Sequence, residues 1–513
     1  MPGFLCRAWM VVVLSPFMLQ ACTSLPETYS RDGSSAIVDY HETGLGRFFA
    51  PMEEANPGAS GLTLIPRGRN AFTARIAMTR LAEKSLDLQY YIWEADQSGR
   101  ILADALLEAA DRGVRVRLLL DDINLGGRDA VVAALDQHPQ VEIRLFNPFA
   151  NRGFRMLDLL GDLGRVNHRM HNKMMVADNA LAILGGRNIG DHYFDVATDA
   201  NFRDLDIAAA GPVVRDTSEV FDYFWNADWS VPIAALVEEG EDGLPSLAEA
   251  RERLAAAIDE ESYPHPVYSE AAELEQEMTE IGARFVWAPA QVVWDDPEDI
   301  REGREEGEIV SALFQRLQSL DRELLVEVAY FVPGQKGAAA LSALTERGVR
   351  VRVLTNSLSS NDVVAAHSGY SVYRERLLES GVELHEVRAD SAEVQQTLLS
   401  GKSRAALHTK AAVFDREAIF VGSFNYDPRS ANLNTEIGLY AESPELAEQL
   451  AAFMDEGVAP HNSYALSLDG EGGLIWRTQR DGVRQQHDYD PATSFSQRFL
   501  SDFMTLLPIE NQL

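Results

Sequence analysis

Apolar residues along the chain follow two alternating patterns, and together they predict helices that alternate with strands. In some stretches apolar positions recur every three or four residues, as on one face of a helix, and in others they form short continuous runs, as in a buried strand. The first part of the sequence gives predicted helices at 71–84, 101–112 and 129–136 and predicted strands at 85–93, 114–120 and 141–146. This order predicts the α/β class, with a mostly parallel sheet that helices cover on both faces.

The same order of elements returns in the second part of the sequence, which indicates an internal duplication. The segment Arg-Gly-Val-Arg-Val-Arg occurs at 112–117 and again at 347–352. Around the second copy the patterns predict helices at 309–320, 337–347 and 370–380 and strands at 323–332, 349–354 and 382–386. Two similar halves favour a functional site at the seam between them.

The N-terminus reads as a secretory signal. An apolar run at 8–19 follows one basic residue and is too short to cross a bilayer with polar ends. The following Leu-Gln-Ala-Cys resembles a lipoprotein cleavage site, with acylation of Cys22; an uncleaved N-terminal anchor is the alternative. Thr23 stands where an Asp would mark inner-membrane retention. We therefore expect a bacterial cell-envelope protein, lipid-anchored at the periplasmic face of the outer membrane.

Composition then divides the chain into regions. Residues 23–60 are rich in Ser, Gly, Pro and acidic residues, which predicts a tether with little core. An acidic stretch separates the two halves, and a glycine-containing tail follows the second half and ends in an amphipathic segment at 495–507. The predicted regions are a signal peptide at 1–21, a tether at 22–60, a first half at 61–230, an acidic linker or insert at 231–305, a second half at 306–460 and a C-terminal extension at 461–513.

The formal net charge of −34 restricts the partners of the protein. A surface this acidic repels the phosphates of nucleic acids and the headgroups of anionic lipids. We expect no nucleic-acid partner, and we expect membrane contact to come from the anchor or from a local patch. Adaptation to salt or solubility is the alternative origin of the charge. Cleavage before Cys22 would remove Cys6, which leaves no disulfide and no cysteine chemistry in the mature chain.

A motif of the form His-x-Lys-x4-Asp occurs twice, once in each half. Its members are His171, Lys173 and Asp178 in the first copy and His408, Lys410 and Asp415 in the second copy. An apolar run and a small-residue turn follow each copy, and an asparagine, Asn188 or Asn425, lies 17 residues after the histidine. Two copies with the same tail in corresponding places are a strong signal, whereas one copy alone would carry little weight.

The spacing fits the chemistry of a phosphate diester. On a strand, residues two positions apart share a face, so each histidine would project beside its lysine. One neutral imidazole can attack phosphorus, and the other, protonated, can protonate the leaving alcohol. Lysine and asparagine donors can stabilise the extra negative charge on the equatorial oxygens. This scheme requires no metal and no other cofactor, and the pattern alone does not decide which histidine attacks.

The doubled motif resembles that of the phospholipase D superfamily, and within it the chain is most similar to bacterial cardiolipin synthases of the C type. Further matching segments lie at 88–93, 112–117, 145–148, 185–190, 421–425 and 434–436. The resemblance implies two similar α/β halves with the active site at their pseudo-twofold seam. It also implies a phosphatidyl-histidine intermediate, phosphatidylglycerol and phosphatidylethanolamine as substrates, and cardiolipin as product. A monomer is expected.

The resemblance also implies roles for individual residues. His171 would be the nucleophile and His408 the acid and base. The residues expected to bind the substrate phosphate are Lys173, Lys410, Asn188, Asn425 and Ser423. Asp178 and Asp415 complete the catalytic motif, or else hold loop backbone. Glu436 would orient one imidazole through its second nitrogen, and Asp204 is the candidate for the other, with Asp206 as the alternative.

Several alternatives stay open at this stage. Water could replace the acceptor alcohol, which would make the protein a hydrolase that releases phosphatidic acid. A nuclease on the same site and a catalytically inactive scaffold are further alternatives, because one fold hosts several functions. Tyr90, Tyr91, Tyr330 and Phe331 either line a lipid-tail channel or pack in the core. The segment 495–507 is expected to pack on the domain, with contact to lipid as the alternative.

Overall fold

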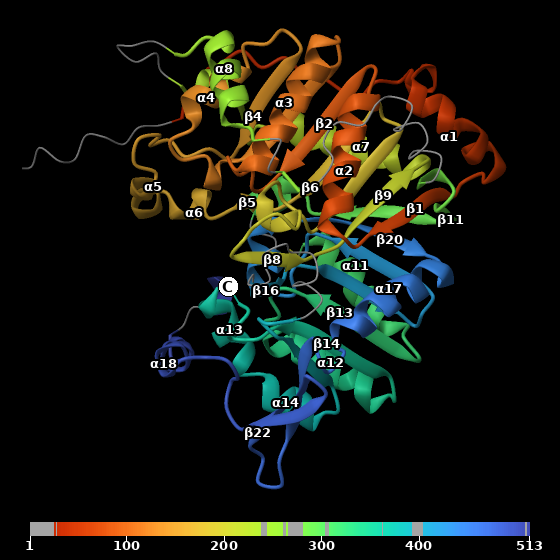
Figure 1. The fold of residues 1–513 in the computed structure, drawn as a ribbon, viewed down its shortest axis with the longest axis vertical. Helices are drawn as coiled ribbons and strands as arrows, with labels where there is room; N and C mark the ends of the chain where they lie inside the picture. Colours follow the sequence, from red (N-terminus) through yellow and green to blue (C-terminus); the bar gives the residue numbers. More distant parts are fainter. Residues whose placement is uncertain are drawn as a thin grey trace, which may run out of the picture.

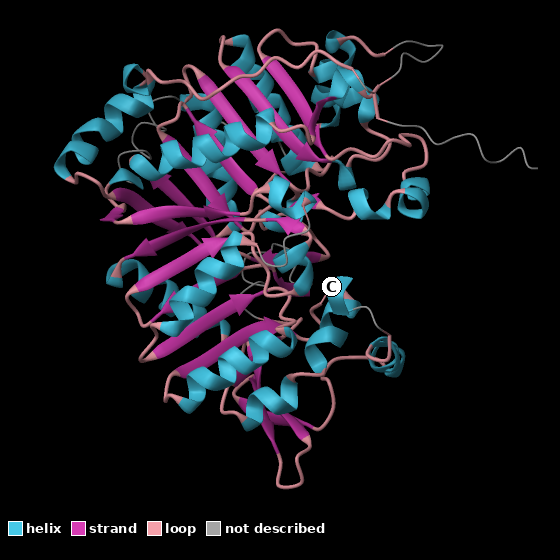
Figure 2. Cartoon of the chain, turned by 180° about the vertical axis from the view of Figure 1, so that it is seen from behind, coloured by secondary structure: helices cyan, strands magenta, loops and turns pink. Residues whose placement is uncertain are grey.

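Two α/β halves are stacked one on the other in the computed structural model (Figure 1). The structure describes residues 25–26, 28–237, 244–259, 263–264, 281–302, 307–361, 363–391, 404–507 and 510–512. Each half is built on a large sheet with helices against it, as the view from behind also shows (Figure 2). The predicted α/β class and the two similar halves are confirmed.

The first half contains a nine-stranded mixed sheet. Its strands, in spatial order, are β10 (Ser230–Pro232), β4 (Val141–Phe146), β3 (Arg115–Asp121), β2 (Ser85–Tyr90), β6 (Lys173–Ala177), β7 (Leu181–Gly185), β9 (Asp206–Ala210), β1 (Ser60–Ile65) and β11 (Val286–Ala288). Among neighbouring strands of this sheet, only the pairs β2–β3 and β3–β4 are parallel, and the other described pairs are antiparallel. The three parallel strands are joined through the helices α3 (Gln97–Asp111) and α4 (Asp129–Leu135), whereas a three-residue turn joins β6 to β7.

The second half repeats this arrangement in a ten-stranded sheet. Its spatial order is β12 (Ala290–Trp294), β20 (Ile437–Glu442), β18 (Ala418–Gly422), β17 (Lys410–Phe414), β13 (Glu323–Val328), β14 (Arg350–Asn356), β15 (Glu383–Val387), β21 (Ser463–Leu468), β22 (Leu474–Arg480) and β23 (Val483–His487). Among the described neighbouring strands of this sheet, only the pairs β13–β14 and β14–β15 are parallel. The expectation of a mostly parallel sheet is therefore wrong for both halves, because tight turns return the chain antiparallel after each crossover region.

A hydrophobic core joins the two halves at the seam. Met174 and Val176 of β6 meet the same cluster as Ala411 and Val413 of β17, and the helices α7 (Pro212–Asn226) and α17 (Pro444–Gly457) complete it. Each half has a further core of its own on the other face of its sheet. The two motif strands are therefore buried on both faces. Burial on both faces fixes the register of each strand, and with it the positions from which the motif side chains project.

The linker region contributes to both sheets. The helix α8 (Leu247–Ala257) lies against α3 and α4. After it, β11 adds an edge strand to the first sheet and β12, only one residue further along, adds an edge strand to the second sheet. This connection ties the two sheets together at one side of the seam.

The expectation of a tether at 22–60 is wrong for its second part. Residues of the helix α1 (Gly44–Ala55) bury Leu45 and Phe49 in the core of the first half, where the Phe49 ring stacks on Phe285. Upstream of this helix, Arg31 donates a hydrogen bond to the backbone oxygen of Ala227. The polar composition of the segment concealed these few apolar anchors. The predicted signal peptide and the acylation site Cys22 lie outside the described residues.

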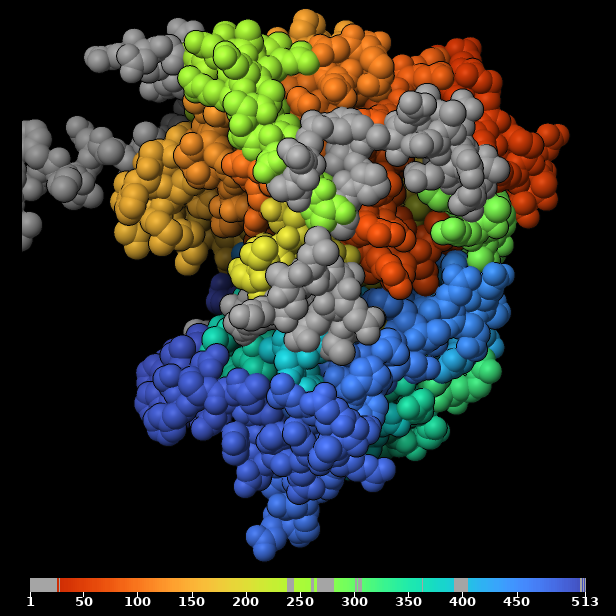
Figure 3. Space-filling model, viewed as in Figure 1, coloured from red at the N-terminus to blue at the C-terminus, as the bar shows by residue number. Residues whose placement is uncertain are grey.

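The C-terminal extension continues the second half. Its strands β21 to β23 add to the sheet edge, and the helix α18 (Phe495–Met504) follows them. The helix packs against α13 (Val364–Ser371), where the hydroxyls of Ser368 and Ser501 lie 3.3 Å apart, as expected for this segment. The side chains of Phe495, Phe499 and Phe503 are 76%, 61% and 48% exposed, so the expected packing fails for these rings. In Figure 3 this end of the chain forms part of the surface of the second half. Among the described residues, no helix is long and apolar enough to span a bilayer.

Candidate active site

Both motif histidines are held in place by the opposite half. The backbone N–H of His171 donates to the carbonyl oxygen of Thr435 (2.9 Å), and the N–H of His408 donates to that of Arg203 (2.8 Å). These bonds continue two short parallel ribbons across the seam, one between β5 (Arg169–Met170) and β19 (Asn434–Thr435), the other between β8 (Ala200–Arg203) and β16 (Arg404–Leu407). The two histidines are 7% and 8% exposed, so they reach the edge of the interior.

Each imidazole also receives a carboxylate from the opposite half. The Nδ1 atom of His171 lies 2.8 Å from Oε2 and 3.0 Å from Oε1 of Glu436. The Nδ1 atom of His408 lies 2.7 Å from Oδ2 of Asp204. In both pairs the Nε2 atom is thereby left for chemistry, which is the arrangement that a catalytic histidine requires. The structure thus gives Glu436 and Asp204 one histidine each and pairs Asp206 with Arg75 instead.

The first of these pairs is electrically neutral near pH 7. Burial lowers the pKa of His171 well below its usual range, and the nearby Lys173, Lys410 and His408 lower it further. Burial also raises the pKa of Glu436 to about 8, against the opposing pull of Lys173. Ser423 donates its hydroxyl hydrogen to Oε2 of Glu436 (2.5 Å) and accepts the N–H of Ile437 (3.0 Å). Ser423 therefore holds this carboxyl group and was wrongly expected to bind phosphate.

The second pair has a charged carboxylate. Burial alone would raise the pKa of Asp204, but His408, Lys410 and Arg187 lower it to about 2. Burial and Lys410 lower the pKa of His408, and Asp204 partly offsets this effect. The two imidazoles therefore face carboxyl groups of opposite ionisation, which makes the site chemically asymmetric although its scaffold is duplicated.

The two motif lysines occupy equivalent positions. Each is almost fully buried, and its ammonium group donates to the backbone oxygen of the histidine two residues earlier (2.5 Å in both cases). Burial lowers the pKa of Lys173 well below its usual range. The Nζ atom of Lys173 lies 5.3 Å from the centre of the Tyr91 ring, which itself packs edge-on against His171 at 4.8 Å. The lysines bring positive charge beside both imidazoles.

The two asparagines differ in their surroundings. The side-chain oxygen of Asn188 accepts the N–H of Ile92 (3.1 Å), and its amide group donates to the hydroxyl of Tyr193 (2.9 Å). The side-chain oxygen of Asn425 is buried and has no hydrogen-bond partner among the described residues. Buried polar atoms normally have partners, so this oxygen is free to accept a hydrogen bond from a donor group of a ligand, such as a hydroxyl.

The motif aspartates lie away from the histidines, which corrects their expected catalytic role. Asp178 accepts the backbone N–H groups of Glu83, Lys84 and Ser85, just before and at the start of β2. Asp415 accepts three N–H groups at the equivalent place before β13. Five residues of strand separate Asp178 from Lys173, about 17 Å. Asp178 and Asp415 also have positive φ angles of 52°, since each begins a tight turn between two motif strands.

The aromatic contacts of the site can be predicted from the sequence only in part. The ring of Tyr193 packs edge-on against His408 with 5.2 Å between ring centres, and Phe202 lies at 5.3 Å. Tyr193 lies in a short 3-10 helix (Asp191–Tyr193) without strand or helix periodicity, so no pattern marks it. Of the four aromatic residues predicted to line a channel or pack in the core, Tyr90 is a core residue that hydrogen-bonds Arg75, and Tyr91 contacts His171.

Two imidazoles with carboxyl partners and two buried ammonium groups, contributed symmetrically by halves of a duplicated α/β scaffold, define a phospholipase D-like phosphodiester-transfer protein. The profile of the family described as "Cardiolipin synthase, PLD-like domain" matches residues 76–225 and 313–457. The chain belongs to this family, which confirms the resemblance seen in the doubled motif.

Individual relatives agree with this assignment. The chain is 37% identical to cardiolipin synthase C of Escherichia coli (strain K12) over 469 residues, which cover 90% of this chain and 98% of the relative. It is 26% identical to cardiolipin synthase A of Pseudomonas syringae over 76% of this chain and 67% of the relative. The crystal structure of phosphatidylserine synthase from Haemophilus influenzae has the same fold, with a TM-score of 0.58, 15% identity and coverage of 91% of this chain and all of that chain.

Proposed function

We propose that the protein is a phosphatidyltransferase that makes cardiolipin from phosphatidylglycerol, phosphatidylethanolamine or both. Its relatives support this substrate class, because several of them are cardiolipin synthases from different bacteria. One structural observation carries the chemistry: each motif histidine has its Nδ1 atom against a carboxyl group of the other half. That arrangement provides two imidazoles with free Nε2 atoms at one seam, as a two-step transfer needs.

The proposed reaction has two steps that use the histidines in turn. In the first step the Nε2 atom of His171 forms a bond to phosphorus, the bond from phosphorus to the headgroup oxygen breaks, and His408 gives its proton to the leaving alcohol. In the second step His408 removes the proton from the acceptor hydroxyl, whose oxygen bonds to phosphorus while the bond to His171 breaks. The phosphatidyl group is thereby transferred, and both histidines return to their initial state.

The contrast between the two carboxyl groups supports this division of roles. His171 is neutral because its pKa is well below its usual range, and a neutral imidazole has the lone pair that attacks. Burial and Lys410 also lower the pKa of His408, but Asp204, a carboxylate with a pKa of about 2, offsets part of this effect and favours the imidazolium form. An imidazolium is the form that can protonate a leaving alcohol. We therefore assign His171 as nucleophile and His408 as acid and base.

Four further residues are proposed to hold the phosphate. Lys173 and Lys410 supply the positive charge that the equatorial oxygens need in the transition state. Asn188 and Asn425 follow the two motifs at the same spacing and are buried in the same region. Their amide groups are uncharged donors and can add directional hydrogen bonds to the same oxygens. Cofactors play no part in this proposal.

Attachment to the membrane is proposed to use two contacts. An acyl group on Cys22 would anchor the chain at the periplasmic face of the outer membrane, and a single acyl chain binds membranes only weakly. The second contact is the exposed apolar face of α18, whose aromatic side chains project away from the body of the protein. Two weak contacts together hold a protein at a surface more firmly than either does alone.

Two other activities on the same site are tested by the same experiment. A hydrolase would use water in the second step and release phosphatidic acid. A nuclease would act on nucleic acid, which the net charge of −34 disfavours.

The test uses the purified protein with vesicles of phosphatidylglycerol and phosphatidylethanolamine, and mass spectrometry of the products. Cardiolipin that depends on His171 supports the proposal, and omission of each lipid in turn identifies donor and acceptor. Phosphatidic acid without cardiolipin would make the protein a hydrolase. Cleavage of DNA that is lost in His408→Ala, with no change in the lipids, would make it a nuclease.

A further inference from the structure

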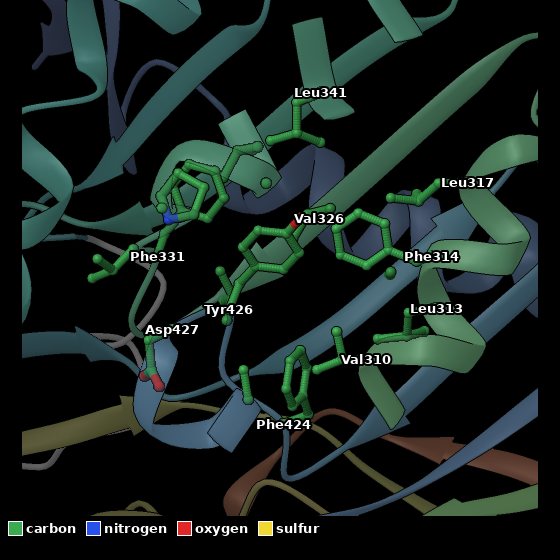
Figure 4. A pocket seen from close by; sticks show the side chains of 18 of the residues that line it. Val310, Leu313, Phe314, Leu317, Val326, Phe331, Leu341, Phe424, Tyr426 and Asp427 are labelled. Atoms are coloured by element: carbon green, nitrogen blue, oxygen red, sulfur yellow. The ribbon is translucent and has the colours of Figure 1, made fainter. Parts of the chain in front are cut away.

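A cavity of about 470 Å³ lies inside the second half, beside one of the two motif strands. It is partly open to solvent and lies between the helix α11 (Glu308–Gln318), the helix α12 (Gly334–Glu346) and the sheet. Its walls are mostly aliphatic and aromatic, with Leu313, Phe314 and Leu317 from α11, Val326 from β13, and Phe424 and Tyr426 from the loop after β18. Figure 4 shows these side chains around a common space. The volume lies in the usual range of small-molecule sites, roughly 300–1,000 Å³.

The cavity and the candidate active site share one residue, Lys410 at the start of β17. Lys410, Ala412 and Phe414 alternate along this strand, so they share one face, and all three line the cavity. The ammonium group of Lys410 bonds the backbone oxygen of His408. The apolar wall therefore starts at the proposed phosphate site and extends along the strand for about 13 Å. The loop after β18 also contributes to both places. Its Phe424 and Tyr426 line the cavity, and its Ser423 contacts Glu436 in the candidate active site.

The first half fills the equivalent space with an ionic group. There Arg75 donates to the carboxylate of Asp206 (2.9 Å) and to the hydroxyl of Tyr90 (3.0 Å), and all three side chains are buried. The strand pairings give the equivalents in the second half: Tyr90 lies opposite Lys173 as Val328 lies opposite Lys410, and Gly185 lies opposite Asp206 as Gly422 lies opposite Gly438.

The third equivalence follows from the turns that the motif aspartates hold. Lys84 and Arg322 donate equivalent backbone bonds to Asp178 and Asp415, and counting back from them pairs Arg75 with Leu313. Where the first half has Arg75, Tyr90 and Asp206, the second half therefore has Leu313, Val328 and Gly438. The ring of Phe420 occupies the place that a side chain on Gly438 would need. Among the described residues, the buried ionic group of the first half thus stands where the second half has an apolar hollow.

A single polar group inside the cavity lacks a partner. The hydroxyl of Tyr426 is buried and forms no hydrogen bond with the described residues. Burial raises the pKa of Tyr426 to about 12, so the hydroxyl keeps its proton and is a donor. In Figure 4 the Tyr426 ring lies in the middle of the lining residues. A ligand that is apolar along most of its length but has a hydrogen-bond acceptor, such as the carbonyl oxygen of an acyl ester, matches this lining.

We propose that this cavity binds one acyl chain of the donor phospholipid while its phosphate lies at Lys410, with the ester carbonyl accepting the hydrogen of Tyr426. This inference rests on the proposed phosphatidyl transfer. We assign the cavity to the donor lipid because its phosphatidyl group must stay in place through both steps. In the same interval the headgroup alcohol leaves and the acceptor alcohol enters. The second half thus selects the lipid, and the first half, with Arg75 in the equivalent place, does not.

The test measures binding without turnover. The probe is phosphatidylglycerol with a pyrene-labelled acyl chain, and the protein is the full chain with His171→Ala. Leu313→Trp and Val310→Phe each fill the cavity from α11, and Val372→Trp adds the same bulk at an exposed position of the same half (54% exposed). Loss of contact with only two methylenes weakens binding roughly tenfold. We expect at least that loss of probe affinity for both filling variants and none for Val372→Trp.

A parallel measurement uses active protein and two donors, dihexanoyl and dioleoyl phosphatidylglycerol. The filling variants should lose the preference for the long-chain donor, seen in KM more than in kcat, and keep turnover of the short-chain donor. Tyr426→Phe should weaken ester lipids by roughly threefold and leave ether-linked analogues unchanged. Probe affinity unchanged by both filling variants, or equal losses in Val372→Trp, would overturn the proposal. Absence of lipid turnover with intact probe binding would instead refute phosphatidyl transfer and leave the acyl-chain site standing.

Discussion

The Nδ1 atom of His171 and the Oε2 atom of Glu436 lie 2.8 Å apart, although 265 positions separate them in the sequence. The reciprocal contact, between His408 and Asp204, spans 204 positions in the opposite direction. Each half therefore supplies a histidine to its own motif and a carboxyl group to the other motif. The ionisation of the two carboxyl groups differs, and this difference leads to the first prediction.

Activity should rise with pH through a step near 8. Below this pH the protonated Glu436 donates to Nδ1 of His171, so the imidazole proton lies on Nε2 and blocks attack. Above it the carboxylate accepts the Nδ1 proton, and Nε2 becomes free. Because the pKa of Glu436 is about 8, kcat/KM should be about tenfold higher at pH 9 than at pH 7. Glu436→Gln should be slower and lose this step. A step that persists in Glu436→Gln would assign it to another group.

The histidine roles can be separated with a donor whose leaving group needs no proton. His408→Ala should lose about 10²- to 10⁴-fold in rate with phosphatidylglycerol but much less in the first step with phosphatidyl-p-nitrophenol. Intact-protein mass spectrometry should then detect a phosphatidyl adduct that persists, because the second step lacks its base. His171→Ala should form no adduct with either donor. The opposite pattern, an adduct in His171→Ala alone, would reverse the two roles.

Loss of a motif aspartate should weaken the fold and spare the chemistry. Asp415→Ala removes the acceptor of three exposed or half-buried backbone N–H groups, and a typical hydrogen bond contributes about 0.5–1.5 kcal/mol to stability. The positive φ angle adds strain for alanine. We expect a lower Tm with kcat/KM of the folded fraction unchanged. Asp415→Asn, which keeps an acceptor and tolerates this φ, is the matched control. A normal Tm with lost activity would return Asp415 to the reaction.

Removal of aromatic side chains from α18 should weaken vesicle binding. The double change Phe499→Ser and Phe503→Ser takes away two exposed rings, each worth about 1.5–3 kcal/mol when fully buried. We expect at least a tenfold loss in sedimentation with vesicles for protein without its acyl anchor, with the same Tm. Val483→Ser, on the exposed strand β23, is the control. Equal binding of the double variant and the wild type would exclude α18 as a membrane contact.

The residues of the candidate site could be predicted from the sequence because the motif occurs twice. The histidines, lysines and asparagines of both copies lie together at the seam, and the two candidate carboxyl groups, Glu436 and Asp204, meet one histidine each. The exchange between halves was not foreseen, since residue spacing describes one chain segment and contains no information on which half it faces. Strand direction failed for a similar reason. Periodicity reports which side chains are buried, and a parallel and an antiparallel strand can bury the same ones.

Other features could not be predicted because they depend on single residues whose neighbours in the sequence form no pattern. Leu45 and Phe49 anchor α1 within a stretch whose average composition is polar. Asp178 lies in the motif yet serves a turn, because the same short sequence contains both the reactive groups and the connection that follows them. The cavity could not be predicted from the sequence, because it arises from the difference between Arg75 and its equivalent Leu313. Only the three-dimensional pairing of strands makes these two residues comparable.

The crossed carboxyl contacts also bear on how the protein is made. Translation adds His171 early, but Glu436 emerges only after most of the chain has left the ribosome. Until then the first motif lacks its proton partner, and the second motif does not yet exist. A nascent chain at the membrane can therefore fold its first half without attacking the surrounding lipids. The same dependence gives a reason why the two halves travel as one polypeptide: a free half would be inert, and a mismatched pair would leave a buried imidazole without its partner.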